Sequence, residues 1–203
     1  MNQTIRAFIA FPLPELITTR IFDIQERLKS YRLPVRWVRP ENVHLTLKFL
    51  GEISLSTIDG IAEVIEATVR DFSPLILFTK GLGVFPGIKK PRVLWIGISG
   101  DVKTLSDIQA NLETHMEQNG FAKENRPFKS HPTLGRFKGS IHPGTLFNIL
   151  GSFSDFASEP FEVKELVLYK SELKPSGAIY TKLQTVYLDG PKKSESDHRG
   201  LTI

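Results

Sequence analysis

The stretch "RPENVHLTLKFLG" (39–51) has a near copy later in the chain, "RPFKSHPTLGRFKG" (126–139). Both read Arg-Pro, three residues, His, one residue, Thr and Leu, so His44 and His131 occupy the same place in the two frames. The chain has five histidines, and two of them share this frame. A duplicated frame predicts weak internal symmetry, in which each half of the chain supplies one copy.

The two histidine motifs predict a pair of strands that expose imidazole and hydroxyl groups together. Side chains alternate between the two faces of a strand, so His44 and Thr46 point the same way. By the same alternation, His131 and Thr133 share a face. Two such strands placed side by side bring two imidazoles and two hydroxyls into one small volume.

This set of side chains suits displacement at phosphorus. One neutral imidazole takes a proton from the attacking oxygen, and a second, protonated imidazole gives one to the leaving oxygen. The hydroxyls of Thr46 and Thr133 donate hydrogen bonds to the phosphoryl oxygens. Two purely structural histidines remain an alternative. A zinc site is a weaker one, because no third ligand stands at metal-like spacing from either motif. We therefore expect no metal and no cofactor.

The second motif contains a glycine that the first lacks. Strict alternation would aim Arg136 away from His131, but a bulge at Gly135 would return it to the same face. We expect Arg136 to contact the substrate phosphate. A solvent-facing Arg136 is the alternative.

The rest of the chain predicts an α+β fold with antiparallel sheets, because amphipathic helices alternate with pairs of strands joined by short turns. The expected helices lie at 15–30, 58–69, 101–116 and 143–153. The expected strands lie at 5–11, 35–38, 42–51, 75–86, 92–99, 128–138, 162–173 and 178–188. No linker divides the chain, so we expect one domain over 1–188 and a flexible polar tail over 189–203.

Composition narrows the setting. The 203 residues include no cysteine, which excludes disulfides and thiolate chemistry and fits a reducing compartment. The start of the chain lacks the layout of a signal peptide, and no apolar run approaches membrane-spanning length. We therefore expect a cytoplasmic monomer without a membrane partner. The formal net charge of +4 suits a phosphate-bearing partner.

The paired motifs "HLTLKFLGE" and "HPTLGRFK" resemble those of the two-histidine (2H) phosphoesterases, in particular the RNA 2′,3′-cyclic phosphodiesterases, also called 2′-5′ RNA ligases. "RAFIAFPLP", "PRVLWIGI" and "GAIYTKL" are similar to that branch as well. The resemblance implies a bilobal fold with helices outside and a pseudo-twofold arrangement around a central cleft. It also implies metal-free hydrolysis of a 2′,3′-cyclic phosphate to a 2′-phosphate.

By position, the resemblance makes His44 the proton donor to the leaving 3′-oxygen and His131 the proton acceptor that activates water. Thr46 and Thr133 would bind the phosphate. The sequence departs from the usual pattern at Ser130, where Pro is common, and at Pro132. Because Pro132 has no N–H, we expect its strand to be at a sheet edge or locally irregular.

The identity of the substrate stays open at this stage. An RNA end carrying a 2′,3′-cyclic phosphate, a small 2′,3′-cyclic nucleotide and a 2′-5′ linkage all suit the same acid–base pair, in hydrolysis or in ligation. A non-catalytic module that binds RNA ends is a further alternative. Phe11 and Tyr180 are the candidates for stacking on a base, with Phe49 and Trp95 as further aromatic residues, although the sequence favours a place in the core for each of them.

Overall fold

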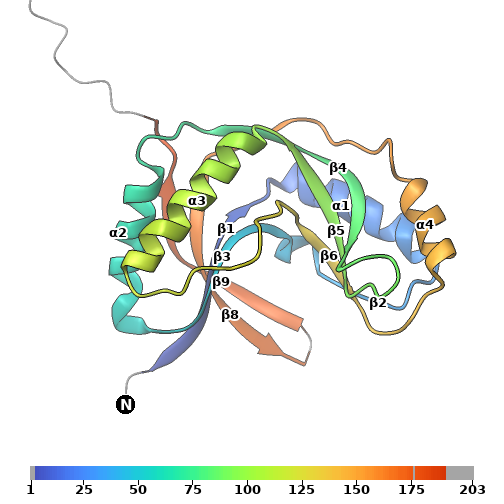
Figure 1. Ribbon diagram of the computed structural model, residues 1–203, viewed down its shortest axis with the longest axis horizontal. Helices are drawn as coiled ribbons and strands as arrows, with labels where there is room; N and C mark the ends of the chain where they lie inside the picture. The colour runs from blue at the N-terminus through green and yellow to red at the C-terminus, as the bar shows by residue number, and fades with distance from the viewer. Residues whose placement is uncertain (1–2, 176, 191–203) are drawn as a thin grey trace, which may run out of the picture.

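The computed structural model describes residues 3–175 and 177–190. Within these residues the strands form two sheets, in which every pairing between neighbours is antiparallel (Figure 1). Sheet A has the order β3-β1-β8-β9 and sheet B the order β2-β6-β5-β4-β7. Sheet A consists of β1 (Thr4–Pro12), β3 (His44–Ser54), β8 (Glu165–Lys174) and β9 (Gly177–Tyr187). Sheet B consists of β2 (Val35–Trp37), β4 (Leu75–Phe85), β5 (Val93–Gly100), β6 (Thr133–Phe137) and β7 (Phe161–Val163).

Four α-helices accompany these sheets in the described residues, with α2 and α3 beside sheet A and α1 and α4 beside sheet B (Figure 1). They are α1 (Glu15–Lys29), α2 (Ile58–Val69), α3 (Val102–Gln118) and α4 (Pro143–Gly151), with short 3-10 turns η1 (Pro40–Asn42) and η2 (Leu55–Thr57). The helical spacing read from the sequence is confirmed, since its apolar positions in α1 and α3 are all buried. The predicted α+β class with antiparallel sheets is confirmed.

Each sheet and the helices beside it form one lobe, and the chain crosses repeatedly between the two lobes. Helix α1 follows β1 of sheet A but contacts sheet B, where the Gln25 amide donates to the Leu134 carbonyl at 3.0 Å. Helix α3 follows β5 of sheet B but contacts sheet A through a 2.6 Å ion pair between Glu113 and Lys48. Helix α1 thus follows a strand of sheet A and packs on sheet B, and helix α3 does the reverse. The buried apolar residues of both sheets therefore form one continuous cluster.

Three strand boundaries differ from the prediction. Strand β3 does not end at Gly51 but continues to Ser54. Strand β6 begins only at Thr133, so His131 precedes the strand. The run at 162–173 is divided into β7 and β8. The strand of the second histidine was expected to be at an edge or locally irregular at Pro132, and the second form is present: β6 lies between β2 and β5, but it begins only after Pro132 and its register with β5 shifts after Thr133. The chain avoids the missing N–H by placing Pro132 just before the first residue of the strand.

The C-terminal tail expected from residue 189 is described only at its start. The Gly190 N–H donates to the Phe72 carbonyl at 3.0 Å, and residues 191–203 lie outside the described residues. No helix within 3–175 and 177–190 is both long and apolar enough to cross a membrane.

Candidate active site

Each motif histidine is held by its own backbone. The Nδ1 atom of His44 lies 2.8 Å from the carbonyl oxygen of Asn42, two residues earlier. The Nδ1 atom of His131 lies 2.5 Å from the carbonyl oxygen of Lys129, also two residues earlier. A carbonyl only accepts hydrogen bonds, so Nδ1 carries the proton in both rings. In the neutral form, Nε2 of each ring is therefore the atom with a lone pair, and both rings have the tautomer of a base.

Aromatic rings surround both histidines. His44 stacks on Phe8 with 4.7 Å between ring centroids, and Tyr180 meets it edge-on at 5.2 Å. His131 meets Phe85 edge-on at 4.8 Å and Trp95 at 6.2 Å. These contacts fix the planes of both imidazoles and withdraw the rings from water.

Burial makes both histidines weak bases in the ligand-free protein. It lowers the pKa of His44 to about 4, against a smaller opposing effect of the Asn42 carbonyl. Burial also lowers the pKa of His131, the Lys129 carbonyl opposes the shift, and the nearby Arg136 charge lowers the pKa further. Both rings are therefore mainly neutral near pH 7 until an anion arrives to stabilise the imidazolium form.

A cavity of about 380 Å³ opens between the lobes. His44 and Thr46 of sheet A line it together with Thr133 and Arg136 of sheet B. His131 precedes Thr133 by two residues and lies close enough to Arg136 for that charge to act on its pKa. The structure thus brings His44, Thr46, Thr133 and Arg136 to one cavity, whereas His131 is not among the residues that line it.

The wall of this cavity is cationic. Four arginines line it, and none of the described lining residues is an aspartate or glutamate. The arginines are Arg6, Arg36, Arg39 and Arg136. Among 3–175 and 177–190, no three His, Asp or Glu side chains stand together in a way that would hold a metal ion. Positive charge, hydroxyls and two imidazoles suit a phosphate ester.

A β-bulge follows the threonine in both motifs. In β3, Thr46 pairs with Ala10 and Lys48 with Ile9, so Leu47 is the extra residue. In β6, Thr133 pairs with Trp95 and Gly135 with Leu94, so the extra residue is again a leucine, Leu134. The predicted bulge beside Gly135 is present, but it is a feature of both copies rather than of the second alone.

The two bulges restore the residue three places after each threonine to the cavity. Phe49 follows Thr46 by three residues, lines the cavity and is 64% exposed. Arg136 follows Thr133 by the same interval and also lines the cavity. Strict alternation would place Arg136 on the opposite face. Arg136 lines the cavity and is also exposed to solvent, so its contact with a substrate phosphate stays a prediction.

Buried polar side chains from the crossing helices support both bulges. Gln25 of α1 is 1% exposed and donates to the carbonyls of Val38 and Leu134 at 2.8 and 3.0 Å. On the other side, the bulge turns Lys48 under α3, where its Nζ lies 2.6 Å from Glu113 and 2.9 Å from the Ala122 carbonyl. Gln25 thus ties the bulge residue Leu134 to helix α1, and the ion pair ties β3 to helix α3 just past its own bulge.

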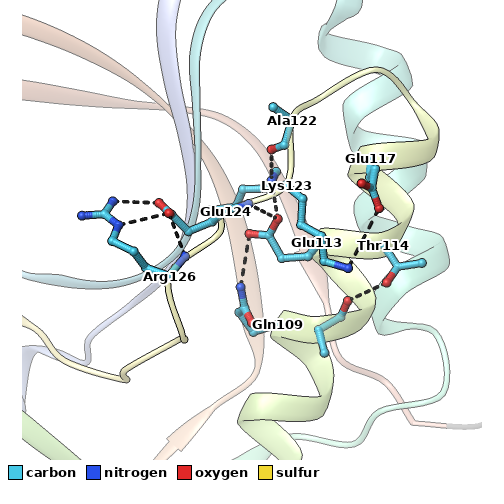
Figure 2. Close-up of polar contacts among 10 residues, drawn as sticks. Gln109, Glu113, Thr114, Glu117, Ala122, Lys123, Glu124 and Arg126 are labelled. Carbon is cyan, nitrogen blue, oxygen red and sulfur yellow. Dashed lines mark hydrogen bonds and ion pairs between the residues drawn. The ribbon is translucent and has the colours of Figure 1, made fainter.

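Glu113 also anchors the segment that leads to the second motif. Its carboxylate accepts from Gln109 at 3.2 Å and from the backbone N–H of Glu124 at 3.2 Å (Figure 2). A single buried carboxylate therefore holds the strand of His44, helix α3 and the approach to His131 together.

The structure places the aromatic residues predicted to stack on a base in different environments. The prediction that Phe11 stacks on a base is wrong. Phe11 is fully buried in the core, on a face of β1 that packs inward, and no base can reach it. Tyr180 lines the cavity and touches His44. Trp95 packs against Phe85 and His131. Arg6 and Arg36 also line the cavity but were not predicted as site residues from the sequence. The only feature of the sequence that could have indicated them is the positive charge in two short strand segments.

The comparisons with known proteins agree with the duplicated site. The family described as LigT like Phosphoesterase matches residues 11–95 and again residues 96–180. Each match contains one histidine motif. The chain belongs to the LigT-like phosphoesterases.

Curated relatives and solved structures cover nearly the whole chain. A Methanothermobacter thermautotrophicus protein named RNA 2′,3′-cyclic phosphodiesterase is 35% identical over 91% of this chain and 99% of its own length. An Aquifex aeolicus protein of the same name is 32% identical over 93% and 100%. The structure of E. coli LigT complexed with 3′-AMP is 27% identical, covers 92% and 99%, and has a TM-score of 0.72. The structure of TT0787 of Thermus thermophilus is 26% identical, covers 91% and 98%, and has a TM-score of 0.75.

The Glu113→Leu variant tests the buried ion pair. It leaves the Lys48 ammonium buried without its partner, and breaking such a pair costs about 3–5 kcal/mol of unfolding free energy. Urea unfolding followed by circular dichroism measures the loss. The Lys48→Met, Glu113→Leu double variant is expected to regain most of it. Glu117→Leu is the matched control on an exposed position of the same helix, and an equal loss there would contradict the assignment.

The histidine pKa values can be followed directly by NMR. We expect the His44 ring to titrate near pH 4 in the free protein, since burial opposes its charge. Inorganic phosphate is expected to raise the pKa of both motif histidines, because the bound anion stabilises the imidazolium form. His44→Asn and His131→Asn variants assign the two resonances. Titration of His44 at an ordinary pKa that phosphate does not move would contradict this description of the site.

Proposed function

We propose that this enzyme hydrolyses RNA ends that carry a 2′,3′-cyclic phosphate and leaves a 2′-phosphomonoester, with His44 and His131 as its acid–base pair and without a metal. The observation that carries the proposal is the matched pair of backbone-locked imidazoles, next to a cavity lined by two threonines and four arginines. The names of the relatives, RNA 2′,3′-cyclic phosphodiesterase, support the same substrate.

The reaction assigns one proton transfer to each ring. Nε2 of His131 takes a proton from water as the water oxygen attacks phosphorus. The bond from phosphorus to the 3′-oxygen breaks, and Nε2 of protonated His44 gives that oxygen its proton. One water is consumed, the product carries a 2′-phosphate and a 3′-hydroxyl, and exchange with solvent resets both rings.

The other polar groups act on the phosphate itself. The hydroxyls of Thr46 and Thr133 donate to the non-bridging oxygens, on which negative charge grows in the transition state. The Arg136 guanidinium adds a charge-assisted hydrogen bond. Tyr180 stands beside His44 and offers a ring face for the terminal base.

We also infer that the protein works as a monomer in the cytoplasm. The two imidazoles, both threonines and the cavity come from one chain, so no second copy is required to complete the site. The absence of cysteine fits a reducing compartment. Light scattering of the purified protein tests the oligomeric state.

The first test is the removal of each histidine. With EDTA present, His44→Ala and His131→Ala are each expected to lower kcat on a short RNA ending in a 2′,3′-cyclic phosphate by about 10²–10⁴-fold, the usual contribution of a general acid or base. The product of the unaltered protein is identified as the 2′- or 3′-monoester.

The matched control is His142→Ala, which removes an exposed histidine outside the cavity and is expected to keep full activity. An intact cyclic end with the unaltered protein would sink the proposal and direct attention to 2′-5′ diesters. Full activity of both motif variants would refute the two-histidine mechanism.

The pH dependence follows from the lowered histidine pKa values. The reactive form has one proton on the pair, and its population peaks between the two apparent pKa values. Since both pKa values lie below 6.5 in the free protein, kcat/KM is expected to be bell-shaped with a maximum below pH 6.5. The bound anion raises both pKa values, so the kcat profile should peak at higher pH. A kcat/KM that still rises above pH 7 would contradict the scheme.

A further inference from the structure

Two arginines stand directly opposite each other in sheet B. Arg36 of β2 pairs with Arg136 of β6 in the antiparallel register, so their side chains share a face and start about 5 Å apart. Both are exposed, and both line the cavity. The side chains of Val35 and Trp37, on either side of Arg36, point to the opposite face of strand β2.

Nothing within the described chain neutralises this pair. None of the ion pairs among 3–175 and 177–190 involves Arg6, Arg36 or Arg136. Like charges placed directly opposite each other on a sheet destabilise it. A fold that keeps two such charges together at the wall of a cavity is suited to anionic groups that bind beside them.

The positive charge of the two arginines is larger than the negative charge of the reacting phosphate. A cyclic phosphate diester carries one negative charge. Arg136 stands with Thr133 on the strand that follows His131 and acts on the pKa of that ring, so Arg136 belongs with the reacting phosphate. Arg36 lies one strand further from β5, at the edge of sheet B, a step of about 4.8 Å. A second phosphate, next to the first along the substrate, would account for it.

We infer that Arg36 forms a second-phosphate subsite, which binds the phosphate on the 5′ side of the terminal nucleoside while the cyclic phosphate occupies the site at Thr133 and Arg136. The inference rests on the proposed function and narrows it. The substrate is a nucleotide with a 5′-phosphate or phosphodiester, and a bare nucleoside 2′,3′-cyclic phosphate leaves Arg36 without a partner.

Three substrates test this subsite. They are a nucleoside 2′,3′-cyclic phosphate, the same compound with a 5′-phosphate, and a dinucleotide that ends in the same cyclic phosphate. The unaltered protein is expected to show kcat/KM at least about tenfold higher on the two substrates that carry the extra phosphate, the size of one charge-assisted hydrogen bond. Their kcat/KM should also fall more steeply with salt, by about 0.7 in the log–log slope.

The Arg36→Gln variant should remove this preference. Because Arg36 is an exposed side chain on an edge strand, the substitution keeps the fold, which circular dichroism checks. We expect roughly a tenfold loss of kcat/KM on the two longer substrates and a clearly smaller loss on the nucleoside 2′,3′-cyclic phosphate, which lacks the group that Arg36 binds. Arg70→Gln, at an exposed position after α2, is the matched control and should change none of the three.

The outcomes separate the subsite from the proposed function. An equal loss on all three substrates would overturn the inference, because Arg36 would then serve the reacting phosphate. No preference of the unaltered protein for the extra phosphate would overturn it as well. A loss on the dinucleotide alone would show that Arg36 reads the upstream nucleoside rather than the phosphate and would also overturn it. If the unaltered protein hydrolyses none of the three, the proposed function itself fails.

Discussion

The bulge after each motif threonine determines which side chains reach the cavity. A regular strand would send Phe49 and Arg136 to the core side, whereas the extra leucine directly after each threonine turns both toward the cavity. A bulge gives up ladder hydrogen bonds. Near these points the fold ties the strands to the crossing helices, through Gln25 of α1 at Leu134 and through the Lys48–Glu113 pair under α3. These helices cross from the other lobe, so the shape of each half of the site depends on the opposite half of the chain.

The sequence predicted the elements and the central residues of the site well, because both depend on local patterns. Apolar spacing located the helices, and the repeated frame singled out His44, Thr46 and Thr133, which line the cavity, and His131, which precedes Thr133 but does not line it. The register could not be predicted in the same way. A bulge at a leucine leaves no local signal, since leucine suits a regular strand as well. The glycine in the second copy suggested a bulge there, but the first copy has the same bulge without a glycine.

Burial explains the remaining errors. Phe11 and Phe49 are both aromatic residues in strand-like segments, yet one is fully buried and the other 64% exposed. The difference comes from the pairing of β1 inside sheet A and from the bulge in β3 at its edge, which are tertiary features. The Lys48 side chain is another case in which burial is not visible in the sequence, because this charged residue is only 3% exposed. Its partner Glu113 lies on a helix that is distant in sequence, so the pair becomes visible only when the lobes are assembled.

The choice of hydrogen-bond partner for the histidines also fits the charge of the site. Many catalytic histidines are oriented by a carboxylate, which raises the pKa of the ring. Here a backbone carbonyl orients each ring. A carbonyl fixes the tautomer without adding a negative charge, so it neither pairs with the cavity arginines nor repels a phosphate. The cost is that burial keeps the rings neutral until the substrate arrives. In the proposed mechanism, the incoming anion supplies the field that holds the proton on the pair, which would couple protonation of the two rings to binding of the phosphate.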